Sequence, residues 1–111
     1  MNRYVLLCSY AVNGDDFFQG AEKVGDYRTV KALYKAIGDD ALHTLKEEVR
    51  GCGWTKEEES EFIEDRFENG FSVSIKEESL QPGRLFEAGW LWFEGTDGSA
   101  KQFSWQVLAI R

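Results

Sequence analysis

The chain is poor in the residues that build metal sites and disulfide frameworks. It contains one histidine, His43, and two cysteines, Cys8 and Cys52. Cys8 lies in an apolar run and Cys52 lies between two glycines, so we expect free thiols in a reducing, cytoplasmic environment. Zinc sites need paired cysteine or histidine ligands, and calcium loops need acids alternating around a glycine, and neither pattern is present. We therefore expect no metal site.

Long apolar runs and phosphate-binding loops are also missing. No stretch approaches the ~18 apolar residues of a membrane span. The apolar stretch within residues 4–12 alternates with polar residues and has no clear cleavage site, so we interpret it as a strand and not as a signal peptide. The glycines of segments 51–53 and 95–98 lack the lysine and the strand–loop–helix context of a nucleotide site. We expect no cofactor and no membrane partner.

Catalytic groups are equally sparse. A nucleophilic centre needs a base, a group that orients it and a nucleophile. His43 has Asp39, Asp40 and Glu47 within helical reach, so it fits either a general base or an ordinary surface position on a helix. Nothing in the sequence places a cysteine near it. Glu87, within a predicted strand, is explained by exposure on a half-polar face. We expect no catalytic residue and no enzymatic activity.

Apolar residues and acids are abundant. With 111 residues, 42% of them hydrophobic and 14% aromatic, the chain fits one globular domain over residues 1–111 with a core that needs no metal or disulfide. The net charge is −7, and the excess falls in residues 51–111, with twelve acids and six bases. Such a field disfavours direct binding to nucleic acid and favours a basic partner.

The first 70 residues predict one strand and three helices. Strand formers fill Arg3–Val12, and residues 15–25 are loop-like. Apolar residues at helical spacing predict a helix over 26–37 that ends at Gly38, and a second helix that begins at residue 39 or 40 and ends before Gly51. The third helix spans residues 55–70, with a capping box at its start and a left-handed Gly70 at its end.

The remaining residues predict three strands. Apolar residues alternate with serines over 71–75, which indicates a half-buried strand. Residues 85–110 form a hairpin around a two-residue type I′ turn at Asp97-Gly98. This turn pairs Glu94 with Lys101. The core face of the hairpin then carries Trp90, Trp92, Phe103 and Trp105, and the second, half-polar face carries Leu91, Phe93 and Leu108.

The fold class is therefore α+β. The order is one strand, three helices and three strands, and it lacks the strand–helix alternation of a parallel sheet. We expect an antiparallel sheet of about four strands with the helices mainly on one face. The predicted core joins the four aromatic residues of the hairpin to Val30, Leu33, Ile37, Leu45, Phe62 and Phe67.

The third helix carries the strongest functional pattern. At about 100° per residue, six carboxylates fall within an arc of roughly 120°, away from the apolar positions. This acidic stripe consists of Glu57, Glu58, Glu61, Glu64, Asp65 and Glu68. The helix has only two bases, Lys56 and Arg66, and they lie off the stripe or at its edge, whereas a solvated helix usually alternates signs. Two interpretations remain open: a solvated surface rich in helix-forming glutamate, and a surface that recognises a basic partner.

Two functions from different classes fit these patterns. The first is a small acidic inhibitor or decoy that blocks a basic protein, such as a nucleic-acid-binding complex or a nuclease, and mimics nucleic acid. Phage anti-defence proteins of the anti-CRISPR kind and immunity proteins against nuclease toxins share this size and charge. The second is a structural or assembly module that docks or dimerises through Leu91, Phe93 and Leu108. Salt dependence separates them, because screening weakens only the first.

Overall fold

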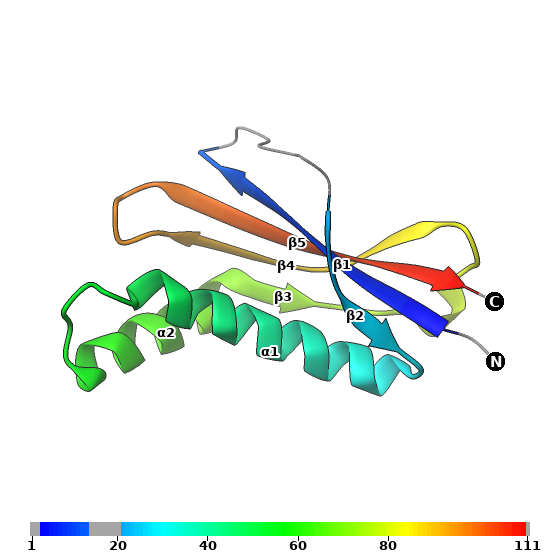
Figure 1. The fold of residues 1–111 in the computed structure, drawn as a ribbon, viewed down its shortest axis with the longest axis horizontal. Coiled ribbons are helices and arrows are strands. Elements are labelled where there is room, and N and C mark those ends of the chain that lie inside the picture. Colours follow the sequence, from blue (N-terminus) through cyan, green and yellow to red (C-terminus); the bar gives the residue numbers. More distant parts are fainter. Residues whose placement is uncertain (1–2, 14–20, 111) are drawn as a thin grey trace.

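The computed structural model describes residues 3–13 and 21–110. They form an antiparallel sheet of five strands whose one side is covered by two helices (Figure 1). The elements are β1 (Arg3–Val12), β2 (Glu22–Tyr27), α1 (Val30–Val49), α2 (Lys56–Gly70), β3 (Phe71–Val73), the 3₁₀ helix η1 (Glu77–Ser79), β4 (Leu85–Glu94) and β5 (Ala100–Ile110). The strand order is β2-β1-β5-β4-β3. The α+β class is confirmed, with one strand more and one helix fewer than predicted.

The additional strand is β2, which lies at one edge of the sheet beside β1. Its sequence, Glu-Lys-Val-Gly-Asp-Tyr, is poor in strand formers. The predicted loop up to Gly25 and the predicted helix start at residue 26 are wrong here, because α1 begins only at Val30 and Asp26 belongs to this strand. Backbone pairing with β1 stabilises it, together with ion pairs from Asp26 to Lys23 (2.6 Å) and to Arg3 (3.4 Å). The part of the predicted loop that covers residues 15–20 lies outside the described residues.

The first two predicted helices are one continuous helix, α1. Gly38 does not end it, and its φ is not positive. Buried side chains recur at every fourth position along the whole helix: Leu33, Ile37, Ala41, Leu45 and Val49. Packing of this stripe against the sheet outweighs the roughly 1 kcal/mol penalty of an internal glycine. Gly51, at φ +81°, follows the helix as predicted.

The β4–β5 hairpin has a register one residue away from the predicted one. Gly95 N–H donates to the Ser99 carbonyl (2.8 Å), which closes a loop of three residues instead of two. Of the three loop residues, Gly98 is the one with a positive φ (+82°). Asp97 accepts hydrogen bonds from the Ser99 N–H and hydroxyl. One extra loop residue exchanges the faces of one strand relative to the other. Leu91 is therefore paired with Phe103, and Trp90 with Ser104.

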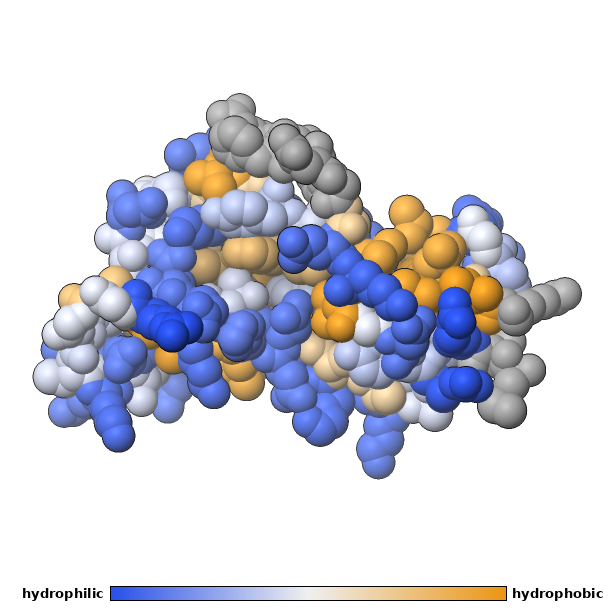
Figure 2. Space-filling model, viewed as in Figure 1, coloured by the Kyte–Doolittle hydropathy of each residue, from blue (hydrophilic) through white to orange (hydrophobic). Residues whose placement is uncertain are grey.

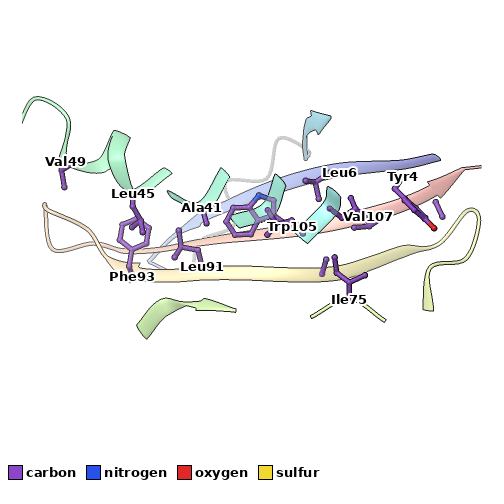
Figure 3. Close-up of a cluster of buried hydrophobic side chains, with 14 of the residues drawn as sticks. Tyr4, Leu6, Ala41, Leu45, Val49, Ile75, Leu91, Phe93, Trp105 and Val107 are labelled. Atoms are coloured by element: carbon purple, nitrogen blue, oxygen red, sulfur yellow. The ribbon is translucent and has the colours of Figure 1, made fainter. Parts of the chain in front are cut away.

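The core lies between the helices and the inner face of the sheet (Figure 3). Trp105 is fully buried at its centre, and its indole N–H donates to Asp40 Oδ2 on α1 (2.8 Å). Gly89 lies opposite Trp105 on β4, and a Cβ at this position would lie 2.9 Å from the Ser72 carbonyl oxygen and 3.4 Å from the Ile37 side chain of α1. Of the predicted core, Leu33, Ile37, Leu45, Phe62 and Trp105 are buried, and Val30, Phe67 and Phe103 are half-buried. The predicted burial of Trp90 and Trp92 is wrong, because they are 40% and 60% exposed.

Lys101 pairs with α1 and not with Glu94. Its ammonium lies 2.6 Å from Glu48 Oε1, and Glu48 Oε2 accepts from the backbone and the hydroxyl of Thr96. Burial raises the pKa of Glu48, but the hydrogen bonds from Lys101 and Thr96 outweigh burial and hold this pKa below its usual value. This half-buried cluster fixes the tip of the hairpin to the last turn of α1.

The side of the sheet turned away from the helices, here called the open face, is covered by neither α1 nor α2 (Figure 1). Apolar surface gathers over the end of the sheet where β5 finishes (Figure 2), and Leu85, paired with Leu108 at that end, is 63% exposed. Neither helix of the described residues has an apolar stretch long enough to cross a bilayer.

Candidate functional site

The acidic stripe lies on α2, which begins with the predicted capping box. Thr55 Oγ1 accepts from the Glu58 N–H (3.1 Å), and Glu58 Oε1 accepts from the Thr55 N–H (3.0 Å). The opposite side of the helix buries Phe62 between Trp54 and Phe93. Because these aromatic contacts hold α2 on the sheet, the helix does not depend on charge pairs along its outer side.

All six carboxylates of the stripe are exposed. Two of them have local roles: Glu58 belongs to the capping box, and Asp65 pairs with Arg66 (2.6 Å) and accepts from the Asn69 amide. Among the described residues, no ion pair involves the other four, Glu57, Glu61, Glu64 and Glu68. They form a row of like charges along the outer side of α2. Their predicted contact with a partner stays a prediction.

The end of α2 differs from the prediction. Gly70 is the last helical residue, and its φ is not positive, so it does not end the helix through a left-handed conformation. A Cβ at this position would lie 2.1 Å from the Trp92 carbonyl oxygen. Glycine is needed there because the last turn of α2 lies directly against the backbone of β4. This contact brings the C-terminal end of the stripe close to the edge of the sheet.

The predicted alternative docking surface is wrong for two of its three residues. Leu91 and Phe93 are 0% and 5% exposed and belong to the core, because the three-residue loop turns them inward. Leu108 is half-buried on the open face. On β4 that face carries Trp90 and Trp92 instead. The segment Gly95-Thr96-Asp97-Gly98 fits both the predicted two-residue turn and a three-residue loop with a single left-handed glycine, so it does not decide between the two registers.

A row of polar side chains crosses the middle of the open face. Gln106 Nε2 donates to the hydroxyls of Ser9 and Ser104, both at 2.9 Å. The Ser104 hydroxyl donates in turn to Glu87 Oε1 at 3.1 Å. These residues line a shallow hollow of about 230 Å³. Glu87 is exposed on this face as predicted, but it is paired with Gln106 and not with Leu108. Sequence patterns alone did not identify this network.

His43 lies exposed on α1, beside a groove of about 480 Å³ between β2 and the helix. Its three candidate carboxylate partners have other partners: Asp39 pairs with Lys35 (2.6 Å), Asp40 accepts from Trp105 (2.8 Å), and Glu47 pairs with Arg50 (3.3 Å). Each of these three carboxylates is therefore paired with a residue other than His43.

The two thiols lie apart from His43 in the sequence and differ in environment. Cys8 is half-buried, and burial, followed by the charges of Asp40 and Glu22, raises its pKa to about 12. Cys52 is exposed after α1, and its Sγ donates to the Glu48 carbonyl. At neutral pH Cys8 is a protonated thiol and a poor nucleophile. Among the described residues, no group of three or more carboxylate, imidazole or thiol side chains is placed to hold a metal ion.

Comparisons with protein-family models, with curated proteins and with solved structures found no match to this chain.

Proposed function

We propose that this protein is a non-enzymatic acidic binder that occupies the nucleic-acid-binding surface of a basic protein and blocks it. The observation that carries the proposal is the row of four exposed carboxylates on α2, which have no ion-pair partner among the described residues. Exposed carboxylates three and four residues apart repel each other in the free protein. A cationic surface relieves this repulsion, so charge complementarity favours the complex over the separated proteins.

The class of partner follows from the sign and spacing of the charges. A protein that handles nucleic acid presents lysine and arginine side chains spaced to contact successive phosphates. A row of carboxylates on a rigid helix offers the same side chains an alternative set of acceptors. Direct binding to nucleic acid is disfavoured, because the net charge of the chain is −7. A nucleic-acid-binding complex or a nuclease is the kind of partner that this surface fits.

The experiment reverses two charges of the stripe and measures the binding of proteins captured from a lysate at low salt. Glu61 and Glu64 are the residues of choice, because neither caps the helix nor pairs with Arg66. Glu61→Lys with Glu64→Lys is expected to weaken binding at least tenfold, about 1.4 kcal/mol. The same reversals place opposite charges at i, i+4 spacing to Glu57 and Glu68, so the stability of the free protein is expected to stay equal or rise.

A matched control has the same net charge but an intact stripe. Glu77 and Glu78 are exposed residues of η1, in the loop between β3 and β4 and away from α2 (Figure 1). Reversal of both to lysine is expected to leave affinity within about threefold of the original, because these two charges lie outside the surface that the partner is proposed to contact. Equal losses in both variants would reduce the proposal to an effect of net charge.

The second candidate function is an assembly module that docks through the open face. The exposure of Leu85, Trp90 and Trp92 favours it, because large apolar groups on one face of a sheet are typical of interaction surfaces. Binding of this kind is expected to change little between low and high salt. Salt-resistant capture that survives the reversals on α2 would favour this function over the acidic binder.

A further inference from the structure

The half of the open face formed by β3, β4 and β5 combines exposed indoles with carboxylates. Trp90 and Trp92 are 40% and 60% exposed, and Glu87 and Glu94 are exposed on the same side of β4. We call these four residues the tryptophan face. The strand alternation of β3 and β5 brings serine, glutamine and small or apolar residues to this side, and Lys101 lies on the other side in its pair with Glu48. The charges beside the indoles are therefore negative.

The carboxylate of Glu87 is hydrogen-bonded to the cross-strand neighbour of Trp90. Ser104 is the cross-strand neighbour of Trp90, and its hydroxyl donates to Glu87 Oε1 at 3.1 Å. The Gln106 amide donates to the same hydroxyl and to Ser9, which is only 5% exposed. This chain of hydrogen bonds links the carboxylate to a buried anchor. Exposed carboxylates are usually mobile, so a hydrogen-bonded carboxylate on the face that carries the indoles is a specific feature.

The last turn of α2 lies against the strand that carries the two indoles. Gly70 packs against the backbone carbonyl of Trp92, whose indole points to the open face, away from α2. Glu68 of the stripe is two residues earlier in the same turn. A partner that contacts both the C-terminal end of the stripe and Trp92 must therefore extend around the edge of the sheet.

We propose that the tryptophan face binds arginine side chains of the basic partner. This inference rests on the proposed function and names the side chain that is recognised. A guanidinium stacks on indoles and donates two parallel hydrogen bonds to carboxylates, and the tryptophan face presents both kinds of group. A lysine ammonium is a strongly hydrated point charge and gains less from such a site.

Other occupants fit the charges less well. A second copy of this chain would place Glu87 and Glu94 against like charges, in a protein of net charge −7. Nucleic acid bases stack on indoles, but their phosphates would approach the same carboxylates. An arginine-bearing protein surface satisfies the indoles and the carboxylates together.

The test measures the affinities of two synthetic peptides, octa-arginine and octa-lysine, by calorimetry at low salt. The intact protein is expected to bind octa-arginine about fivefold more tightly, as one exposed cation–π pair allows. Trp90→Leu with Trp92→Leu keeps apolar side chains but removes both indoles. It is expected to abolish the preference for arginine and to leave octa-lysine affinity unchanged. Glu87→Gln still accepts from Ser104, and it is expected to reduce the preference as well.

The stripe variant separates this inference from the proposed function. Glu61→Lys with Glu64→Lys is expected to weaken both peptides by the same factor. If octa-arginine and octa-lysine bind equally to the intact protein, or if the preference survives the loss of both indoles, the inference is overturned while the stripe keeps its role. If neither peptide binds, both proposals fail. Should the double leucine variant unfold, Trp92→Leu alone is measured instead, because Trp92 is the more exposed indole.

Discussion

Gly38→Ala tests whether α1 is one continuous helix, whose buried side packs on the inner face of the sheet. Gly38 lies in the middle of the helix, and a Cβ built at this position has no atom within 4 Å apart from its chain neighbours and the helix's own nearby backbone. Alanine therefore adds a methyl group without a clash and removes the backbone freedom of glycine in the unfolded chain. The expected result is a stabilisation of about 1 kcal/mol, which raises the melting temperature by about 4 °C in a domain of this size.

Gly70→Ala is the matched substitution with the opposite expected sign. Gly70 also lies in a helix, but its Cβ would be 2.1 Å from the Trp92 carbonyl oxygen, a backbone atom that cannot rotate away. The clash forces α2 away from β4, and we expect a loss of about 1–3 kcal/mol, as for an overpacked core position. Intrinsic helix propensity alone would make both alanines stabilising.

The assay is urea denaturation followed by far-UV circular dichroism, with the three proteins measured side by side. Equal slopes with shifted midpoints would report stability alone. If Gly38→Ala destabilises the protein, the chain ends a helix at Gly38 with a left-handed glycine, as the sequence pattern predicted. A stabilising Gly70→Ala would refute the close contact between α2 and β4.

Three further predictions concern the core, the hairpin and His43. Trp105→Ala is expected to lower the free energy of unfolding by about 3–5 kcal/mol, because Trp105 is buried. Trp92→Ala should change this free energy by less than about 0.5 kcal/mol. Equal effects of the two substitutions in denaturation curves would contradict the observed strand register. Glu48→Gln is expected to flatten the pH dependence of stability. The pKa of Glu48 is lower in the folded protein than in the unfolded chain, so its carboxylate stabilises the fold above about pH 4.3. This contribution is lost as the pH falls through the folded-state pKa. Thermal melts between about pH 6 and pH 3 measure it, and parallel curves for both proteins would exclude the effect. His43→Ala is expected to leave partner binding within about twofold, and a large loss with the fold intact would place His43 in the binding surface.

Local sequence signals were sufficient where the structure depends on neighbouring residues. The capping box at Thr55 and Glu58 predicted the start of α2 because both hydrogen bonds are made within one turn. The alternation of Arg3–Val12 predicted β1 with its observed bounds. Asp-Gly predicted a hairpin correctly, since both tight loops accept this pair.

Long-range packing decided the features that local signals missed. Two-residue and three-residue loops differ locally by little, but they exchange Leu91 and Phe93 with Trp90 and Trp92 between core and surface. The three-residue loop places Gly89 opposite the buried indole of Trp105, and Asp40 of α1 accepts a hydrogen bond from this indole. Those partners are separated by tens of residues along the chain. The docking surface predicted from the sequence therefore included Leu91 and Phe93, which lie on the wrong side of β4.

The central claim is that the acidic stripe attracts a basic partner before contact. The most direct measurement is the association rate of the captured partner with the intact protein and with the Glu61→Lys, Glu64→Lys variant, over a range of salt concentrations. We expect the rate for the intact protein to fall steeply with salt, and the variant to associate at least about tenfold more slowly at low salt with a similar dissociation rate. An association rate that neither salt nor the reversals change would contradict the claim and leave α2 as a solvated surface.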